Sequence, residues 1–141
     1  MTDRQPDRRH VVLLVEDEQD IREALHTVLH RESCEVLQAE DGSEALRLLR
    51  ERAARKNQIP CAILLDLWMP GMSGDEFLAA LAADPDFSKI PVVVLTGAPG
   101  EGPERRWSQV RQVIAKPFRL ETVFEAIQPS CESCSDALIR K

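Results

Sequence analysis

The sequence predicts an α/β fold, a doubly wound sheet of five parallel strands in the order 2-1-3-4-5. Two observations support this prediction. Short apolar runs alternate along the 141 residues with segments that carry apolar residues at helical spacing. Most of these runs are apolar throughout and end in polar residues, which is typical of strands buried on both faces of a parallel sheet. Such polar ends lie at the carboxyl edge, where open α/β sheets hold ligands.

The first third of the chain predicts two strands and the helix between them. One strand is expected at residues 10–16, where a run of Val and Leu leads into Glu16-Asp17-Glu18. The second strand, residues 35–39, alternates in polarity, which favours the edge of the sheet. The helix between them has an apolar face made of Ile21, Leu25, Val28 and Leu29.

The middle third contains two capping boxes that predict the starts of two further helices. Asp41 is followed three residues later by Glu44, and Ser73 by Glu76. Between these helices lies an apolar run that contains Asp66 and ends at a Pro-Gly turn, which is typical of a buried central strand. The two helices bury apolar faces made of Ala45, Leu46, Leu48 and Leu49, and of Phe77, Leu78 and Leu81.

The last third predicts two strands with a broken segment between them. A strand at residues 91–96 ends in Thr96-Gly97, and one at residues 112–116 ends in Lys116-Pro117. The segment between them is rich in glycine and proline, so a fourth helix is expected to be short, about residues 104–109. From Pro129 onward a loose tail is expected. The last helix, which precedes this tail, has an apolar stripe of Leu120, Val123, Phe124 and Ile127.

Length and charge restrict the class of protein. The chain fits one domain, residues 10–128, with a charged lead at 1–9 and the tail at 129–141. The net charge of −6 argues against direct binding to nucleic acid. No apolar run is long enough for membrane insertion, and residues 1–10 lack a signal-peptide core, so a cytoplasmic location is expected.

Two pairs of potential metal ligands lie away from the strand ends. Cys131 and Cys134 form one CxxC in the tail with no second pair, so we interpret them as uncommitted. His26 and His30 are four apart on the first helix without a third ligand, so a solvated helix face is favoured.

The predicted strand order brings distant acids together. It places the first strand beside the third, so that Glu16 and Asp17 lie next to Asp66. Three crowded carboxylates repel one another, and hard oxygen ligands at an exposed strand edge suit Mg²⁺. With the metal bound, Asp66 is a candidate nucleophile toward phosphorus, Lys116 a candidate partner for the phosphoryl oxygens, and Thr96 a hydroxyl donor.

Four motifs together resemble a known family. They are Leu-Val-Glu16-Asp17-Glu, Leu-Leu-Asp66-Leu-Trp-Met-Pro-Gly-Met-Ser-Gly74, Val-Leu-Thr96-Gly and Lys116-Pro117-Phe118. In order and spacing, over about residues 10–128, they are similar to the receiver domain of two-component response regulators, which has the flavodoxin/CheY-like fold. The resemblance implies a phosphorylation-controlled signalling switch or relay that stands alone and is not a turnover enzyme.

The resemblance also implies a role for each site residue. Asp66 would accept the phosphoryl group from a sensor histidine kinase or a histidine phosphotransfer protein, and an unknown downstream protein would read the result. Asp17 would bind Mg²⁺ directly and Glu16 through water, with Asp66 and the backbone carbonyl of Trp68 as further ligands. Thr96 would be the switch hydroxyl. Lys116 would pair with the phosphoryl group and precede a cis bond to Pro117.

Two departures from the family pattern keep an alternative open. Val113 stands three residues before the lysine, where the family usually has a switching Tyr or Phe, and the segment of the fourth helix is short. A receiver-like module that binds partners without phosphorylation is therefore the alternative. Trp107 is a candidate for the missing ring, although packing is favoured. An aspartyl hydrolase is disfavoured because Trp68 occupies the place of the second acid that such enzymes need.

Overall fold

The computed structural model describes residues 10–31, 34–55, 59–69 and 71–139. Within them lies one sheet of five strands, all paired in parallel, in the order β2-β1-β3-β4-β5. The predicted fold class, strand order and edge position of β2 are confirmed. The strands are β1 (His10–Val15), β2 (Cys34–Ala39), β3 (Ala62–Asp66), β4 (Val92–Thr96) and β5 (Val110–Ala115).

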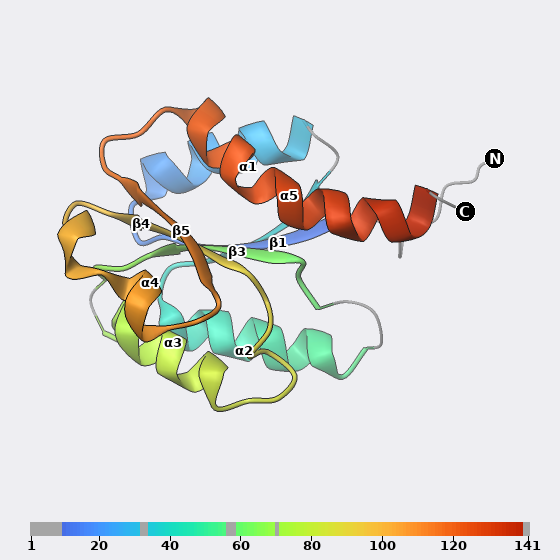
Figure 1. Cartoon of the computed structure of the whole chain (residues 1–141), viewed down its shortest axis with the longest axis horizontal. Coiled ribbons are helices and arrows are strands. Elements are labelled where there is room, and N and C mark those ends of the chain that lie inside the picture. Colours follow the sequence, from blue (N-terminus) through green and yellow to red (C-terminus); the bar gives the residue numbers. More distant parts are fainter. Residues whose placement is uncertain (1–9, 32–33, 56–58, 70, 140–141) are drawn as a thin grey trace.

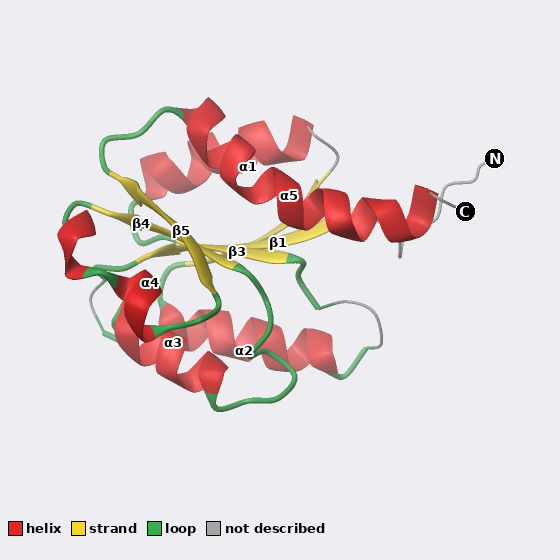
Figure 2. Cartoon of the chain, in the orientation of Figure 1, coloured by secondary structure: helices red, strands yellow, loops and turns green. Residues whose placement is uncertain are grey.

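Helices cover both faces of the sheet (Figures 1 and 2). One face is covered by α1 (Gln19–Arg31) and α5 (Leu120–Ile139), and the other by α2 (Gly42–Ala53) and α3 (Gly74–Ala82). The short α4 (Pro103–Arg106) follows a single 3-10 turn, η2 (Pro99–Glu101). This three-layer arrangement leaves the ends of the strands free to carry polar groups.

Each face of the sheet has its own apolar core. Val12 and Leu14 of β1 belong to the core beneath α1 and α5, whereas Leu13 and Val15 belong to the core beneath α2 and α3. The division follows from the strand, in which successive side chains point to opposite faces. Every residue of β3 is buried, which explains why this strand is apolar up to Asp66.

The two predicted capping boxes form to different extents. At α3 the box is complete, because Ser73 accepts from the Glu76 N–H and Glu76 accepts from the Ser73 N–H. At α2 the Asp41 side chain accepts from the Glu44 N–H, but the Glu44 carboxylate accepts from the N–H of Glu40. In the box at α2, the Glu44 carboxylate therefore accepts from the N–H of Glu40, one residue before the N-cap residue Asp41.

The fourth helix is shorter than predicted and begins earlier. It covers Pro103–Arg106 and not residues 104–109. Trp107 ends it in an extended conformation, and this residue packs against the core beneath α2 and α3 together with Val113. Packing of the indole ring therefore overrides the helical continuation that the sequence allowed.

The prediction of a loose tail after Pro129 is wrong for the described residues, because α5 continues through Pro129 to Ile139. Proline removes one backbone donor and crowds the preceding turn, but it does not prevent the following residues from remaining helical. The side chains of Cys131 and Cys134 lie outside the described part of the chain, as do the lead at 1–9 and Pro70. None of the described helices is both long enough and apolar enough to cross a bilayer.

Candidate functional site

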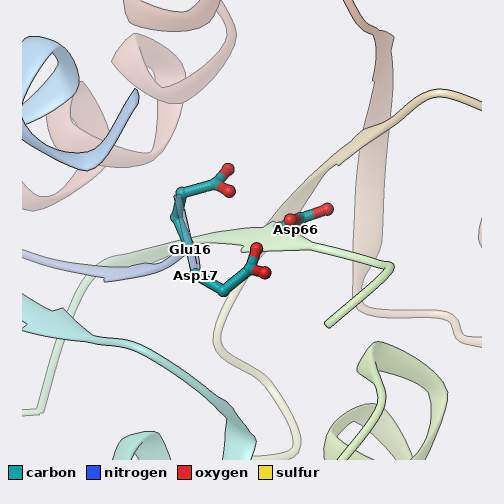
Figure 3. Close-up of side chains that lie close together, drawn as sticks. All are labelled: Glu16, Asp17 and Asp66. Atoms are coloured by element: carbon teal, nitrogen blue, oxygen red, sulfur yellow. The ribbon is translucent and has the colours of Figure 1, made fainter. Parts of the chain in front are cut away.

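Three carboxylates meet at the carboxyl edge of the sheet, where β1 and β3 end side by side (Figure 3). Val15 pairs with Leu65 in the sheet, so Glu16 and Asp17 follow β1 at the level where Asp66 ends β3. One oxygen from each side chain lies within 4.8 Å of the others. Glu16 is 0% exposed and Asp66 is 3% exposed, whereas Asp17 is exposed. The proximity predicted from the strand order is therefore present.

Lys116 completes this cluster from the end of β5. Its Nζ lies 3.3 Å from Asp66 Oδ2 and 3.4 Å from Glu16 Oε1. Its backbone N–H donates to the Thr96 carbonyl at 2.8 Å, which extends the β4–β5 pairing to the lysine. The Lys116–Pro117 peptide bond is cis, as the resemblance implied.

Burial and mutual repulsion make the ionised forms of the clustered carboxylates unfavourable without additional positive charge. Like charges about 4 Å apart cost about 4 kcal/mol at an effective dielectric constant of about 20. Burial, and then the charge of Asp66, raise the pKa of Glu16 from 4.5 to about 8. Burial also raises the pKa of Asp66. Burial pulls the pKa of Lys116 down, but the charges of Asp66 and Glu16 outweigh burial and raise it.

The cluster fits a divalent cation bound by oxygen. Glu16 Oε1 is buried and has no hydrogen-bond partner among the described residues, although it lies beside the Lys116 ammonium. The carboxylates of Glu16, Asp17 and Asp66 are hard ligands, and their repulsion would be offset by a bound cation. Because Asp17 is exposed, one side of the cluster is open to solvent, which suits an ion that keeps several waters.

The remaining predicted site residues lie around this cluster. The Trp68 N–H donates to Asp66 Oδ1 at 3.2 Å, which holds the backbone of Trp68 beside the carboxylate. The Trp68 side chain is 60% exposed. Thr96 is one residue beyond Leu95, the sheet partner of Asp66, and its buried hydroxyl accepts from the Ala98 N–H at 3.0 Å.

The loop between β3 and α3 is held close to the sheet by a glycine. The Gly74 N–H donates to the Leu67 carbonyl at 3.0 Å. A Cβ atom at position 74 would lie 2.7 Å from the Leu67 Cα atom, so only glycine fits there without movement of the backbone. This close approach fixes the path of the chain directly after Asp66.

Val113 occupies the position, three residues before Lys116, where the resemblance implies a switching Tyr or Phe. Val113 and Trp107 both pack against the core beneath α2 and α3. The Trp107 indole N–H donates to Asp75 Oδ1 at 3.3 Å, and the Arg106 guanidinium contacts the same oxygen at 2.8 Å. The ring is therefore tied to the first turn of α3, which supports the packing role favoured from the sequence.

A groove of about 540 Å³ opens beside the cluster, between α1 and the segment that follows β5. Lys116, which contacts Asp66, is part of its wall. Most of its lining is apolar, and two acids contribute to it. The groove is lined by Glu18, Asp20, Ile21, Ala24, Lys116, Pro117, Phe118 and Leu120. The sequence pattern did not identify this groove, because it is formed by the packing of two segments distant in the chain.

The His26 and His30 rings stack with their centroids 5.6 Å apart. Among the described residues, the one group of three or more potential metal ligands is the carboxylate cluster. The histidine pair therefore remains a helix-surface feature.

Comparison with known proteins gives consistent similarities. The model of the response regulator receiver domain family matches residues 12–128. Protein PilH of Pseudomonas aeruginosa is 29% identical over 82% of this chain and 93% of its own length. The regulatory protein PhoB of Escherichia coli is 35% identical over 84% of this chain, which spans about half (53%) of PhoB.

Solved structures agree with the sequence comparison. The chemotaxis protein CheY4 of Vibrio cholerae matches with a TM-score of 0.74 and 30% identity, over 86% of this chain and 98% of that chain. The Mn²⁺-bound form of response regulator Rcp1 matches with a TM-score of 0.67 and 32% identity, over 85% of this chain and 90% of that chain. The residues matched by the family model, 12–128, include Glu16, Asp17 and Asp66.

Proposed function

Because the chain belongs to the family of response regulator receiver domains, we propose that it accepts a phosphoryl group on Asp66 in a reaction that depends on Mg²⁺. The phosphoryl donor would be the phosphohistidine of a sensor kinase or of a phosphotransfer protein. The family acts as a signalling switch and not as a turnover enzyme. The single observation that carries the proposal is the contact of Lys116 with Asp66 at 3.3 Å inside a cluster of three carboxylates.

The proposed reaction is a direct transfer from nitrogen to oxygen. A carboxylate oxygen of Asp66 forms a bond to phosphorus as the bond between phosphorus and the histidine nitrogen of the donor breaks, and the imidazole takes a proton. Lys116 Nζ lies where it can pair with the phosphoryl oxygens. Glu16 and Asp17 would hold Mg²⁺ with Asp66, and the ion would supply positive charge to the transferring group. The Mn²⁺-bound form of the similar protein Rcp1 supports a divalent cation.

Thr96 would bind the acquired phosphoryl group. Its hydroxyl lies at the end of β4 and is buried, where it now accepts from the Ala98 N–H. A hydroxyl can donate and accept at once, so it can hydrogen-bond a phosphoryl oxygen without losing this contact. Because the Ala98 N–H donates to this hydroxyl, a shift of Thr96 toward the phosphoryl group would move the loop after β4 as well. The position of this loop would then report the phosphorylation state.

The direct test is incubation of the chain with Mg²⁺ and a small acyl phosphate, followed by mass measurement of the intact protein. The proposal requires a gain of one phosphoryl group that disappears when the Mg²⁺ is chelated. The alternative, a module that binds partners without phosphorylation, is favoured by Val113 in place of the switch aromatic. It requires partner binding of equal strength with and without the acyl phosphate.

The groove beside Lys116 is suited to the phosphohistidine-bearing partner. Its apolar wall fits the apolar stripe of a partner helix, and Glu18 and Asp20 favour basic residues beside that stripe. A partner seated there would bring its histidine to the side of the cluster that Lys116 occupies.

We expect Ala24→Arg to reduce transfer from a phosphorylated histidine phosphotransfer protein by about tenfold or more, which is about 1.4 kcal/mol. Ala24 lines the groove, so the added side chain would fill it. Phosphorylation by the small acyl phosphate, which needs no docking, should remain unchanged. The matched control is Ala53→Arg at the exposed end of α2, on the other face of the sheet. Equal loss with both donors would contradict docking in the groove.

We expect Trp68→Asn to speed the loss of the phosphoryl group severalfold. The Trp68 side chain is 60% exposed and its backbone touches Asp66, so the ring is available to shield the acyl phosphate from water. The measurement is the decay of phosphorylated protein after removal of the donor. Trp68→Phe keeps an aromatic ring and should decay at nearly the native rate, and an unchanged rate in Trp68→Asn would reject the shielding.

A further inference from the structure

Arg22 of α1 connects two loops at the carboxyl edge of the sheet. Its Nη1 atom donates to the backbone carbonyl of Glu16 at 2.7 Å. Its Nη2 atom lies 3.8 Å from Glu40 Oε2, in the loop between β2 and α2. The Arg22 side chain is only 12% exposed, whereas Glu40 is 73% exposed. The contact with the Glu16 carbonyl is therefore the short and sheltered one of the two.

The carbonyl that Arg22 contacts belongs to the peptide group that joins Glu16 to Asp17. Because that peptide is planar, holding its oxygen fixes the orientation from which both acidic side chains leave the backbone. The N–H of Glu16 is held as well, since it donates to the Ala39 carbonyl at 3.0 Å. With β1 ending at Val15, no strand pairing at Glu16 supplies a donor for this carbonyl among the described residues.

The positive charge of Arg22 opposes metal binding, whereas its hydrogen bond to the Glu16 carbonyl favours it. A guanidinium beside the carboxylates repels a divalent cation, so electrostatics alone would make Arg22 unfavourable for metal binding. Positioning and repulsion thus predict opposite signs for the effect of removing Arg22. The strength of a hydrogen bond from a charged donor to a sheltered carbonyl favours positioning as the larger effect.

From this geometry we propose that Arg22 is a positioning residue that holds the Glu16–Asp17 peptide in the conformation that binds a divalent cation, and that it strengthens this binding on balance. The inference rests on the metal site of the proposed function but not on phosphoryl transfer. Arg22 acts through the Glu16 carbonyl and does not itself contact the ion.

The test is a calorimetric titration of the metal-free full chain with Mg²⁺ for four variants, with a melting curve for each. Arg22→Met keeps the apolar stem and removes every donor, and it should weaken Mg²⁺ binding by about ten- to hundredfold, as loss of such an outer contact usually does. Arg22→Lys, which keeps one charged donor, should recover part of the affinity. Glu40→Gln removes the exposed ion pair and should change the affinity by less than about twofold.

The fourth variant is a matched control for loss of an arginine. Arg47→Met on α2 removes a guanidinium that pairs with Glu51 at 2.8 Å on the surface, and it should leave Mg²⁺ affinity unchanged. Unchanged or tighter Mg²⁺ binding in Arg22→Met would overturn the inference. If Arg22→Met does not fold, native affinity in Arg22→Lys together with weakened affinity in Glu40→Gln would overturn it. Absence of Mg²⁺ binding by the native chain would instead overturn the proposed metal site itself.

Discussion

Replacing Asp66 with asparagine is expected to abolish phosphoryl incorporation from an acyl phosphate in the presence of Mg²⁺. The side chain keeps its size and can still accept from the Trp68 N–H, but the amide is not a nucleophile toward phosphorus. It also removes one of the three carboxylates of the cluster. The measurement is the mass of the intact protein after incubation with the donor, where the native chain should gain one phosphoryl group and the variant none.

Unfolding would not explain such a loss. Asp66 is buried and its pKa is raised by burial, so its ionised form is less favourable in the metal-free fold than in the unfolded chain. A neutral amide at this position relieves repulsion with Glu16, and the melting temperature of the metal-free variant should be at least that of the native chain. Asp86→Asn, an exposed acid after α3, is the matched control and should be phosphorylated normally. Full incorporation in Asp66→Asn would place the acceptor elsewhere.

The stability of the metal-free chain is expected to fall as the pH rises from about 4.5 to about 8. Glu16 has an ordinary pKa of 4.5 and a folded-state pKa of about 8, raised by burial and then by the charge of Asp66. The unfolded chain therefore releases this proton at lower pH than the folded chain does. Each pH unit within this window costs about 1.4 kcal/mol of unfolding free energy, on the order of a few kcal/mol in total.

Among the described residues, three other groups have shifted pKa values. The pKa of Asp66 is raised by burial, so its ionisation also lowers stability as the pH rises. The pKa of Lys116 is raised, so its stabilising contribution is lost only at pH values above the ordinary 10.5. The pKa of His10 is lowered by burial, so its contribution has the opposite sign and is lost as the pH falls from 6.5 toward the lowered pKa of the folded state. Comparison with Glu16→Gln removes the Glu16 carboxylate and its coupling to Asp66, and it leaves the contribution of His10 unchanged.

The measurement is the melting temperature at several pH values with and without Mg²⁺. Without the ion, the native chain should lose stability toward pH 8 and Glu16→Gln should show a flatter profile. With the ion, the native chain should regain most of this loss, because the bound cation offsets the ionised carboxylates. An identical pH profile for the native chain and Glu16→Gln would show that Glu16 is not held in its neutral form.

The sheet could be predicted because its information is local. Residues 11–15 and 92–95 are apolar without interruption, which identifies buried strands, and the polar residues after them mark one edge. The strand order then followed from general rules of topology, and it placed Glu16 and Asp17 beside Asp66. Only the proximity of these groups was settled in this way; their roles in metal binding and phosphoryl transfer remain predictions.

The features that were missed depend on side chains that meet from distant segments. Arg22 looks like any charged residue on the polar face of a helix, and nothing in the sequence shows that it contacts the Glu16 carbonyl. The packing of Trp107 was favoured from the sequence, but its hydrogen bond to Asp75 was not predicted, because it depends on how the short segment after β4 folds back. Pro129 led to the prediction that a loose tail follows the last helix, but the disfavour of proline in helix interiors is a tendency, and α5 continues through it to Ile139.

The hydrogen bond between Trp107 and Asp75 has a consequence for α4. A helix of one turn, Pro103–Arg106, has too few internal hydrogen bonds to persist by itself in water. The end of α4 is stabilised by contacts with α3, because Arg106 and Trp107 both donate to the same carboxylate oxygen of Asp75. The position of α4 is therefore coupled to that of α3, so that a displacement of the first turn of α3 would move this short helix with it.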